Sequence, residues 1–161
     1  MVTETLHPKL ADILRRCARE VFEATVGSTP TSVEPCAVPT RGFDDEVVGV
    51  LGFTGSRRGA LVVATGDRLA CAMAARLQEP GTGGPGDAAD DGFARVVARL
   101  GAGFRAAWTE GGHLLELAVP YVVRGGRVLV AAAGSAGLRS CVRVAIEDRH
   151  VDVGVQFEAR S

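Results

Sequence analysis

Residues 47–65 read VVGVLGFTGSRRGALVVAT. The two arms of this segment, 46–54 and 59–64, are apolar and rich in β-branched residues, and glycine, serine and arginine at 55–58 separate them. Short apolar runs bounded by turn residues are typical of β-strands. The segment therefore predicts a β-hairpin, from which the rest of the fold can be built outward.

Helices are predicted on both sides of this hairpin. The first follows His7-Pro8, where proline suits the first helical position, and it ends at the glycine and proline of 27–30. The second spans about 67–77 and the third about 90–109, each with apolar residues at helical spacing.

The third predicted helix follows a glycine-rich segment, 80–89. That segment comes after a helix rather than a strand and lacks a GK[ST] sequence, so we expect a surface loop and not a phosphate-binding loop. The apolar stripe that predicts the buried side of the third helix consists of Phe93, Val96, Val97, Leu100, Phe104 and Trp108.

Strands are predicted mainly in the C-terminal third of the chain. The candidate segments are 114–123, 127–133, 139–146 and 150–157, with a further short strand, interrupted by prolines, within 32–39. Helices followed by a run of strands are incompatible with a regular βαβ series, which argues against a Rossmann fold. We therefore predict one α+β domain, with mixed α/β layers, over residues 1–161.

The overall charge restricts the classes of partner. The 161 residues include 18 basic and 19 acidic side chains, so the chain has the size of one domain and no basic excess for nucleic acid. No run of apolar residues is long enough for a transmembrane helix, and Glu4 and His7 stand where an apolar signal core would lie. We expect a cytoplasmic protein that binds neither nucleic acid nor a membrane.

The cysteines and histidines are dispersed along the sequence. Cys17, Cys36, Cys71 and Cys141 fall on separate predicted elements, and no CxxC or clustered ligand pair occurs. A chain of this length builds its core without disulfides, and zinc sites need clustered ligands. We expect cysteines that pack as small apolar side chains, with no disulfide, no metal site and no cofactor.

Four segments of the sequence carry a family resemblance. They are EVFEATVG (20–27), the hairpin (47–65), RLGAGFRAAW (99–108) and ELAVPYVVRG (116–125). Together they resemble the CheC/CheX family of chemotaxis phosphatases, and specifically a single-domain CheX-like protein. The resemblance implies helices packed on a largely antiparallel sheet. It also implies removal of the phosphoryl group from the aspartate of a CheY-type response regulator in a two-component pathway.

In this family an E-x-x-N pair on the third helix is implied to do the chemistry: the acid holds the regulator's lysine, and the amide orients the attacking water. Aligned on Gly103, the acid position falls on Val96 and the amide position on Arg99. Between Gly92 and Thr109 there is no Asp, Glu, Asn or Gln, and the chain has no asparagine at all. No register restores the pair, so we expect no intact catalytic residue and a pseudoenzyme.

The exposed side of the third helix offers a docking surface instead. Its predicted partner-binding residues are Arg95, Arg99, Ala102, Gly103 and Ala106. The two arginines lie one turn apart and repel one another unless an acidic group is near, such as the phosphorylation pocket of a response regulator. Two alternatives stay open: a solvated face on which Asp91 pairs with Arg95, and Arg99 acting as an arginine finger.

Pro120, inside the predicted strand 114–123, indicates an edge or bulge position and hence an open sheet margin. CheX-like relatives are associated with strand-mediated dimers, so the resemblance implies a homodimer. A bulge without a partner is the alternative.

The sequence thus predicts a non-catalytic or strongly impaired CheX-like signalling domain that binds a response regulator or a related signalling protein. The alternative is an active aspartyl-phosphate phosphatase that uses substitute residues. A small-ligand sensor or dimerisation domain is a weaker alternative, because the sequence shows no polar cluster for a ligand.

Overall fold

A computed structural model describes residues 8–26, 30–36, 46–55, 58–77, 85–110, 114–125 and 139–158. Its elements, in chain order, are α1 (Pro8–Val26), β1 (Ser32–Pro35), β2 (Val47–Gly55), β3 (Gly59–Thr65), α2 (Asp67–Leu77), α3 (Pro85–Thr109), β4 (Leu115–Leu117), β5 (Tyr121–Arg124), β6 (Arg139–Ile146) and β7 (Arg149–Phe157). The α+β class predicted from the sequence is confirmed.

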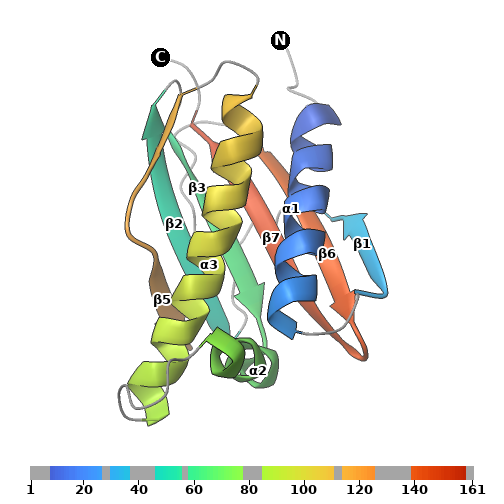
Figure 1. Ribbon diagram of the computed structural model, residues 1–161, viewed down its shortest axis with the longest axis vertical. Coiled ribbons are helices and arrows are strands. Elements are labelled where there is room, and N and C mark those ends of the chain that lie inside the picture. Colours follow the sequence, from blue (N-terminus) through green and yellow to red (C-terminus); the bar gives the residue numbers. More distant parts are fainter. Residues whose placement is uncertain are drawn as a thin grey trace.

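The strands form one antiparallel sheet in the order β1-β6-β7-β3-β2-β4, and β5 also pairs with β2. The predicted hairpin is confirmed, because β2 and β3 pair in register from Val47 opposite Thr65 to Phe53 opposite Gly59. The long helices α1 and α3 lie across one face of the sheet, and α2 lies near the end of β3 (Figure 1).

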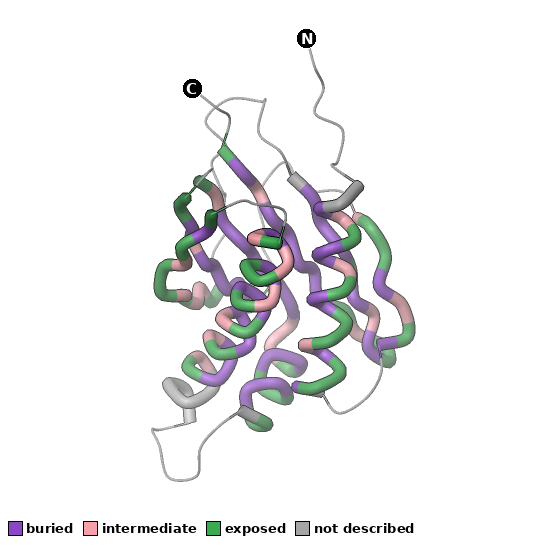
Figure 2. Tube along the Cα trace, turned by 45° about the horizontal axis from the view of Figure 1, so that its top comes forward, coloured by how far each residue is buried: buried purple, intermediate pink, exposed green. Residues whose placement is uncertain are grey.

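The main core lies between this sheet face and the helices, where the purple, buried parts of the strands and helices meet (Figure 2). At its centre Phe53, Phe104, Trp108 and Phe157 pack together, with ring centroids 5.1–6.3 Å apart. The opposite face of the hairpin is buried as well, through Val48, Val50, Ala60, Val62 and Ala64. Burial on both faces explains why the hairpin sequence is continuously apolar rather than alternating.

Two predicted boundaries were wrong. The loop predicted over 80–89 ends early, because α3 begins at Pro85 and not near Asp90. Proline has no N–H and so fits the first position of a helix, and the helix then extends over residues that contribute no apolar stripe.

The single strand predicted over 114–123 is instead two short strands, β4 and β5, with 118–120 between them. Pro120 cannot donate to a strand ladder, which explains the interruption. The predicted strand 127–133, the loop residues 80–84 and the end of the 32–39 segment lie outside the described residues. None of the described helices is long and apolar enough to cross a membrane.

Candidate functional site

The candidate site is the side of α3 that points away from the sheet. The structure leaves Arg95, Arg99, Ala102 and Ala106 exposed on this side, together with Arg105, which the sequence reasoning missed. We call these five residues the arginine face. They lie at helical spacing along about three turns, so three guanidinium groups and two small side chains share one flank of the molecule.

The arginine face is exposed because the opposite stripe of α3 is fully committed to the core. All six residues of the predicted stripe are buried, each with at most 8% of its surface exposed. Trp108 stacks on Phe104 and Phe157, so its role is core packing. The predicted buried side of the helix is therefore confirmed.

Glycines let α3 approach its neighbours closely. A Cβ atom on Gly101 would lie 2.1 Å from Leu51 Cδ2 of the sheet, and one on Gly92 would lie 2.7 Å from the Cα of Ala74 in α2. Gly103 is only half-buried and points toward α1, where a Cβ would meet Cys17 Sγ at 3.6 Å. Gly103, which we predicted among the partner-binding residues, thus borders the arginine face on its α1 side.

The two positions aligned with the family's acid–amide pair lie in different surroundings. Val96 has none of its surface exposed and belongs to the main core, whereas Arg99 faces solvent. A carboxylate at position 96 would point at apolar side chains and not at a partner. The arginine face itself offers donors on its arginines and methyl groups on its alanines, with no acceptor to aim a water molecule.

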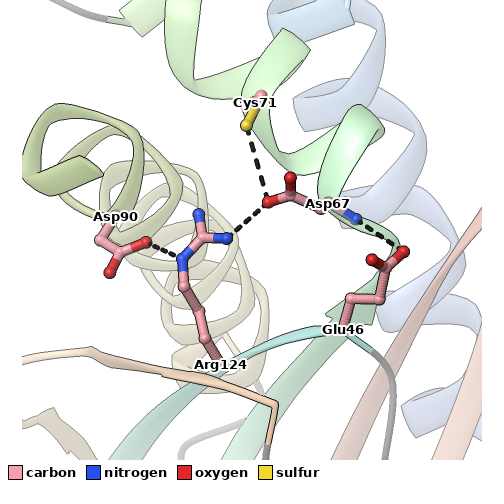
Figure 3. A network of polar contacts seen from close by, with 5 residues as sticks. All are labelled: Glu46, Asp67, Cys71, Asp90 and Arg124. Carbon is pink, nitrogen blue, oxygen red and sulfur yellow. Dashed lines mark hydrogen bonds and ion pairs between the residues drawn. The ribbon is translucent and has the colours of Figure 1, made fainter. Parts of the chain in front are cut away.

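A network of charged side chains anchors the N-terminal half of α3 (Figure 3). Arg124 of β5 lies between two carboxylates: its Nη1 is 2.5 Å from Asp67 Oδ1, and its Nε is 2.5 Å from Asp90 Oδ1. Asp67 opens α2 and also receives the Cys71 thiol at 3.7 Å, while its backbone N–H donates to Glu46. One arginine therefore connects α2, α3 and β5.

The hydrogen bond from Arg124 lowers the pKa of Asp67 below its usual value. The side chains of Asp67, Asp90 and Arg124 are 38–47% exposed, so water screens the two ion pairs. Their main effect is to orient α2, α3 and β5 relative to one another. No local sequence pattern predicts this network. The partner of Asp90, Arg124, is 34 residues away along the chain on β5.

The structure also assembles charged residues that are distant in the sequence. An open pocket of about 600 Å³ is lined by Glu46, Asp67, Arg68, Asp148, Arg149 and His150, among others. A second pocket lies beside the end of β2 and the start of β3, and no described residue of α3 lines either pocket. Within the described ranges, no three His, Cys, Asp or Glu side chains are grouped to hold a metal ion.

The expectation that the cysteines pack as small apolar side chains holds for two of them and is wrong for the exposed one. Cys17 and Cys141 are buried and Cys71 is exposed. Cys36, at the end of β1, lies directly beside Cys141 of β6, although 105 residues separate them. Strand pairing, which no local pattern revealed, brings these two residues together.

No family model and no curated protein sequence matches the chain. Solved structures do match over nearly its whole length. The chemotaxis protein CheX from Desulfovibrio desulfuricans superposes with a TM-score of 0.76 at 17% identity, covering 93% of this chain and 99% of that one. A putative chemotaxis protein from Desulfovibrio vulgaris Hildenborough gives a TM-score of 0.76 at 16% identity, with 96% and 100% covered.

A third match is CheX in a complex with CheY, BeF3 and magnesium from Borrelia burgdorferi, at a TM-score of 0.69 and 14% identity, with 92% and 97% covered. The helices on one face, the antiparallel sheet and the length all correspond. At these identities the likeness concerns the fold. The chain has the fold of the CheX/CheC-like chemotaxis proteins.

Proposed function

We propose that this chain is a chemotaxis-type signalling domain that docks a CheY-type response regulator on the arginine face and does not dephosphorylate it efficiently. The fold supports the class of pathway, since several solved structures with this fold are chemotaxis proteins and one of them was solved bound to CheY. The charge of the arginine face supports the type of partner.

The observation that carries the docking proposal is the composition of this face. Arg95, Arg99 and Arg105 are exposed, and no acidic residue occurs between Gly92 and Thr109. The phosphorylation pocket of a receiver domain is acidic, and a positive surface steers and orients such a partner. The alanines between the arginines allow a partner element to approach the helix closely.

The chemistry of the same residues argues against efficient hydrolysis. Phosphoryl transfer depends mainly on positioning, and arginine has five donors but no acceptor with which to orient a water molecule. Loss of one preorganised polar group costs on the order of 100-fold in rate in comparable sites. Arg99 can still contact a phosphoryl group electrostatically, which would favour binding of the phosphorylated regulator without supplying a nucleophile.

Fluorescence anisotropy with a labelled CheY-type regulator, activated by beryllofluoride, tests the docking surface. Arg99→Glu is expected to weaken binding at least about tenfold, because it reverses one charge at the centre of the face. Arg58→Glu makes the same charge change at an exposed position before β3, outside the arginine face, and serves as the matched control.

The binding of the control should equal that of the unmodified protein, and the affinity of the unmodified protein should fall as salt is raised. Equal losses for Arg99→Glu and Arg58→Glu would show that general charge, and not this face, governs binding. Undiminished binding by Arg99→Glu would refute the proposed surface.

A further inference from the structure

Cys36 and Cys141 form a pair of thiols that neither the fold nor the proposed function uses. The pairing of β1 with β6 sets Pro35 opposite Val142, so the next residues along, Cys36 and Cys141, are directly opposed. The Cys36 N–H donates to the Cys141 carbonyl at 2.8 Å, and the two Sγ atoms are 2.7 Å apart.

The backbone geometry suits a covalent bond between them. Opposed residues on antiparallel strands have Cα atoms about 4.5–5.5 Å apart, inside the range of about 4.4–6.8 Å that disulfides span. Side chains of opposed residues also point to the same side of the sheet. The two cysteines point away from the helices. On β6 the side chains alternate between the two faces, and Val142 and Val144 belong to the helix-facing core.

The two sulfurs differ in their surroundings. Cys141 is buried with 1% exposed, whereas Cys36 is half-buried and accessible to a small reagent. The hydrogen-bonded contact with Cys141 lowers the pKa of Cys36 and outweighs the opposing effects of burial and of Asp152, and the guanidinium of Arg143 makes a smaller contribution in the same direction as Cys141. Contact with Cys36 and burial raise the pKa of Cys141. Cys36 is therefore the sulfur that ionises first.

Arg143 is itself held in place beside this pair. It donates from Nε and Nη2 to the two oxygens of Asp152 on β7, at 2.8 and 3.0 Å. By contrast, burial raises the pKa of Cys17 to about 11, which keeps that thiol protonated. The surroundings thus single out one reactive thiol with a second sulfur in contact.

We propose that Cys36 and Cys141 are a redox-active dithiol, which hydrogen peroxide converts into a disulfide between β1 and β6 and which a dithiol reductant restores. The Cys36 thiolate attacks one peroxide oxygen, the O–O bond breaks, and hydroxide leaves to give a sulfenic acid. The Cys141 sulfur then attacks the Cys36 sulfur, the S–O bond breaks, and the proton of Cys141 leaves with the hydroxyl group as water. Two thiols and one peroxide give one disulfide and two waters.

The disulfide would tie the edge strand β1 to the interior of the sheet. It would close a loop of 105 residues, and long loops restrict the unfolded chain most. A reversible bond of this type is the form in which disulfides occur in reducing compartments. The oxidised protein is therefore expected to melt at a higher temperature than the reduced protein, by at least about 5 °C.

Peptide mapping after treatment of the reduced protein with hydrogen peroxide tests the proposal. Trypsin releases Cys36 in the peptide 20–41 and Cys141 in the peptide 140–143, so the disulfide would appear as one linked pair that dithiothreitol separates. Cys71→Ser, which removes the exposed thiol, is expected to leave this linked pair intact, whereas Cys36→Ser removes it.

The expected result is the linked pair in most molecules, loss of two titratable thiols and the rise in melting temperature in the Cys71→Ser protein. Oxidation of Cys36 to sulfinic acid without a link would overturn the proposal. Disulfides formed mainly through Cys71 between two molecules would overturn it too. The Cys141→Ala variant is the control for a folding defect. It lacks the second sulfur, so its Cys36 should still form the sulfenic acid but no linked pair.

Discussion

Val96 and Arg99 are three residues apart on α3, yet one is enclosed in the core and the other faces solvent. Residues at this spacing lie about 60° apart around a helix, so the boundary between the packed and exposed sides falls between them. The acid position of the family motif, as aligned on Gly103, is therefore occupied by a packing residue. The valine side chain is apolar, so it packs well in the core and cannot bind a partner's lysine.

Val96→Glu is expected to lower the free energy of unfolding by at least about 3 kcal/mol, because it places an unpaired carboxylate in the core. Arg99→Asn, a change on the solvent side of the same helix, should stay within about 0.5 kcal/mol of the unmodified protein. Urea unfolding of both variants measures the contrast. Similar small effects for both would show that position 96 is accessible after all.

At the scale of elements, glycines and one arginine set how α3 lies against its neighbours. Gly92 permits contact with the backbone of α2, and Arg124 joins the starts of α2 and α3 to β5. The sequence predicted the hairpin and the buried stripe of α3 because both are repeats of one side-chain type. Arg124 could not be predicted in this way, since its partners are 34 and 57 residues distant.

Replacing two glycines of α3 by alanine is expected to change stability in opposite directions. Gly92→Ala should be destabilising despite the better helix propensity of alanine, because its Cβ would lie 2.6–2.8 Å from Ala74, including backbone atoms. Gly103→Ala should stabilise by about 0.5–1 kcal/mol, because its Cβ meets Cys17 at an ordinary distance. Thermal unfolding of the two variants checks the signs, and a stabilising Gly92→Ala would contradict the close contact of α2 with α3.

The Asp67–Arg124 pair predicts a pH dependence. Because the folded pKa of Asp67 is lowered, the stability that this pair contributes is present above the unfolded pKa, near 4. It is lost as the pH falls through the lower folded value. Arg124→Met should therefore be less stable than the unmodified protein in urea unfolding near neutral pH. The difference between the two free energies of unfolding should shrink as the pH drops below about 4.

The titration of the Asp67 carboxyl, followed by NMR, should move back toward its ordinary value in Arg124→Met. Arg76→Met, at the other end of α2, is the control that should leave the Asp67 titration unchanged. An Asp67 titration that is identical with and without Arg124 would contradict the network.

At the scale of the whole molecule, the described strands form a sheet with two margins, β1 and the β4–β5 side. Val119 and Tyr121 are 84% and 56% exposed at the second margin, next to the proline that interrupts it. Open margins with apolar side chains favour pairing with another chain. The sequence pointed to this margin through Pro120, because proline restricts strand pairing in any context, but the division into β4 and β5 depends on long-range pairing with β2.

We therefore predict a homodimer through this margin. Val119→Lys should shift the protein toward the monomer in light scattering coupled to gel filtration, because it places a charge where apolar surface would be buried. Glu34→Lys on β1, at the opposite margin, should leave the dimer unchanged. A dimer that survives Val119→Lys and dissociates with Glu34→Lys would place the interface at β1 and contradict this prediction.

The central claim is that the arginine face binds a phosphorylated regulator without hydrolysing its aspartyl phosphate. The most direct test is the decay rate of the phosphorylated CheY-type regulator at a saturating concentration of this protein, measured by release of inorganic phosphate. The account predicts a rate within about twofold of that of the regulator alone, although anisotropy shows the regulator to be bound, because no side chain of the arginine face has an acceptor with which to orient a water molecule. A 100-fold or greater acceleration would contradict it and would show that other residues have replaced the acid–amide pair.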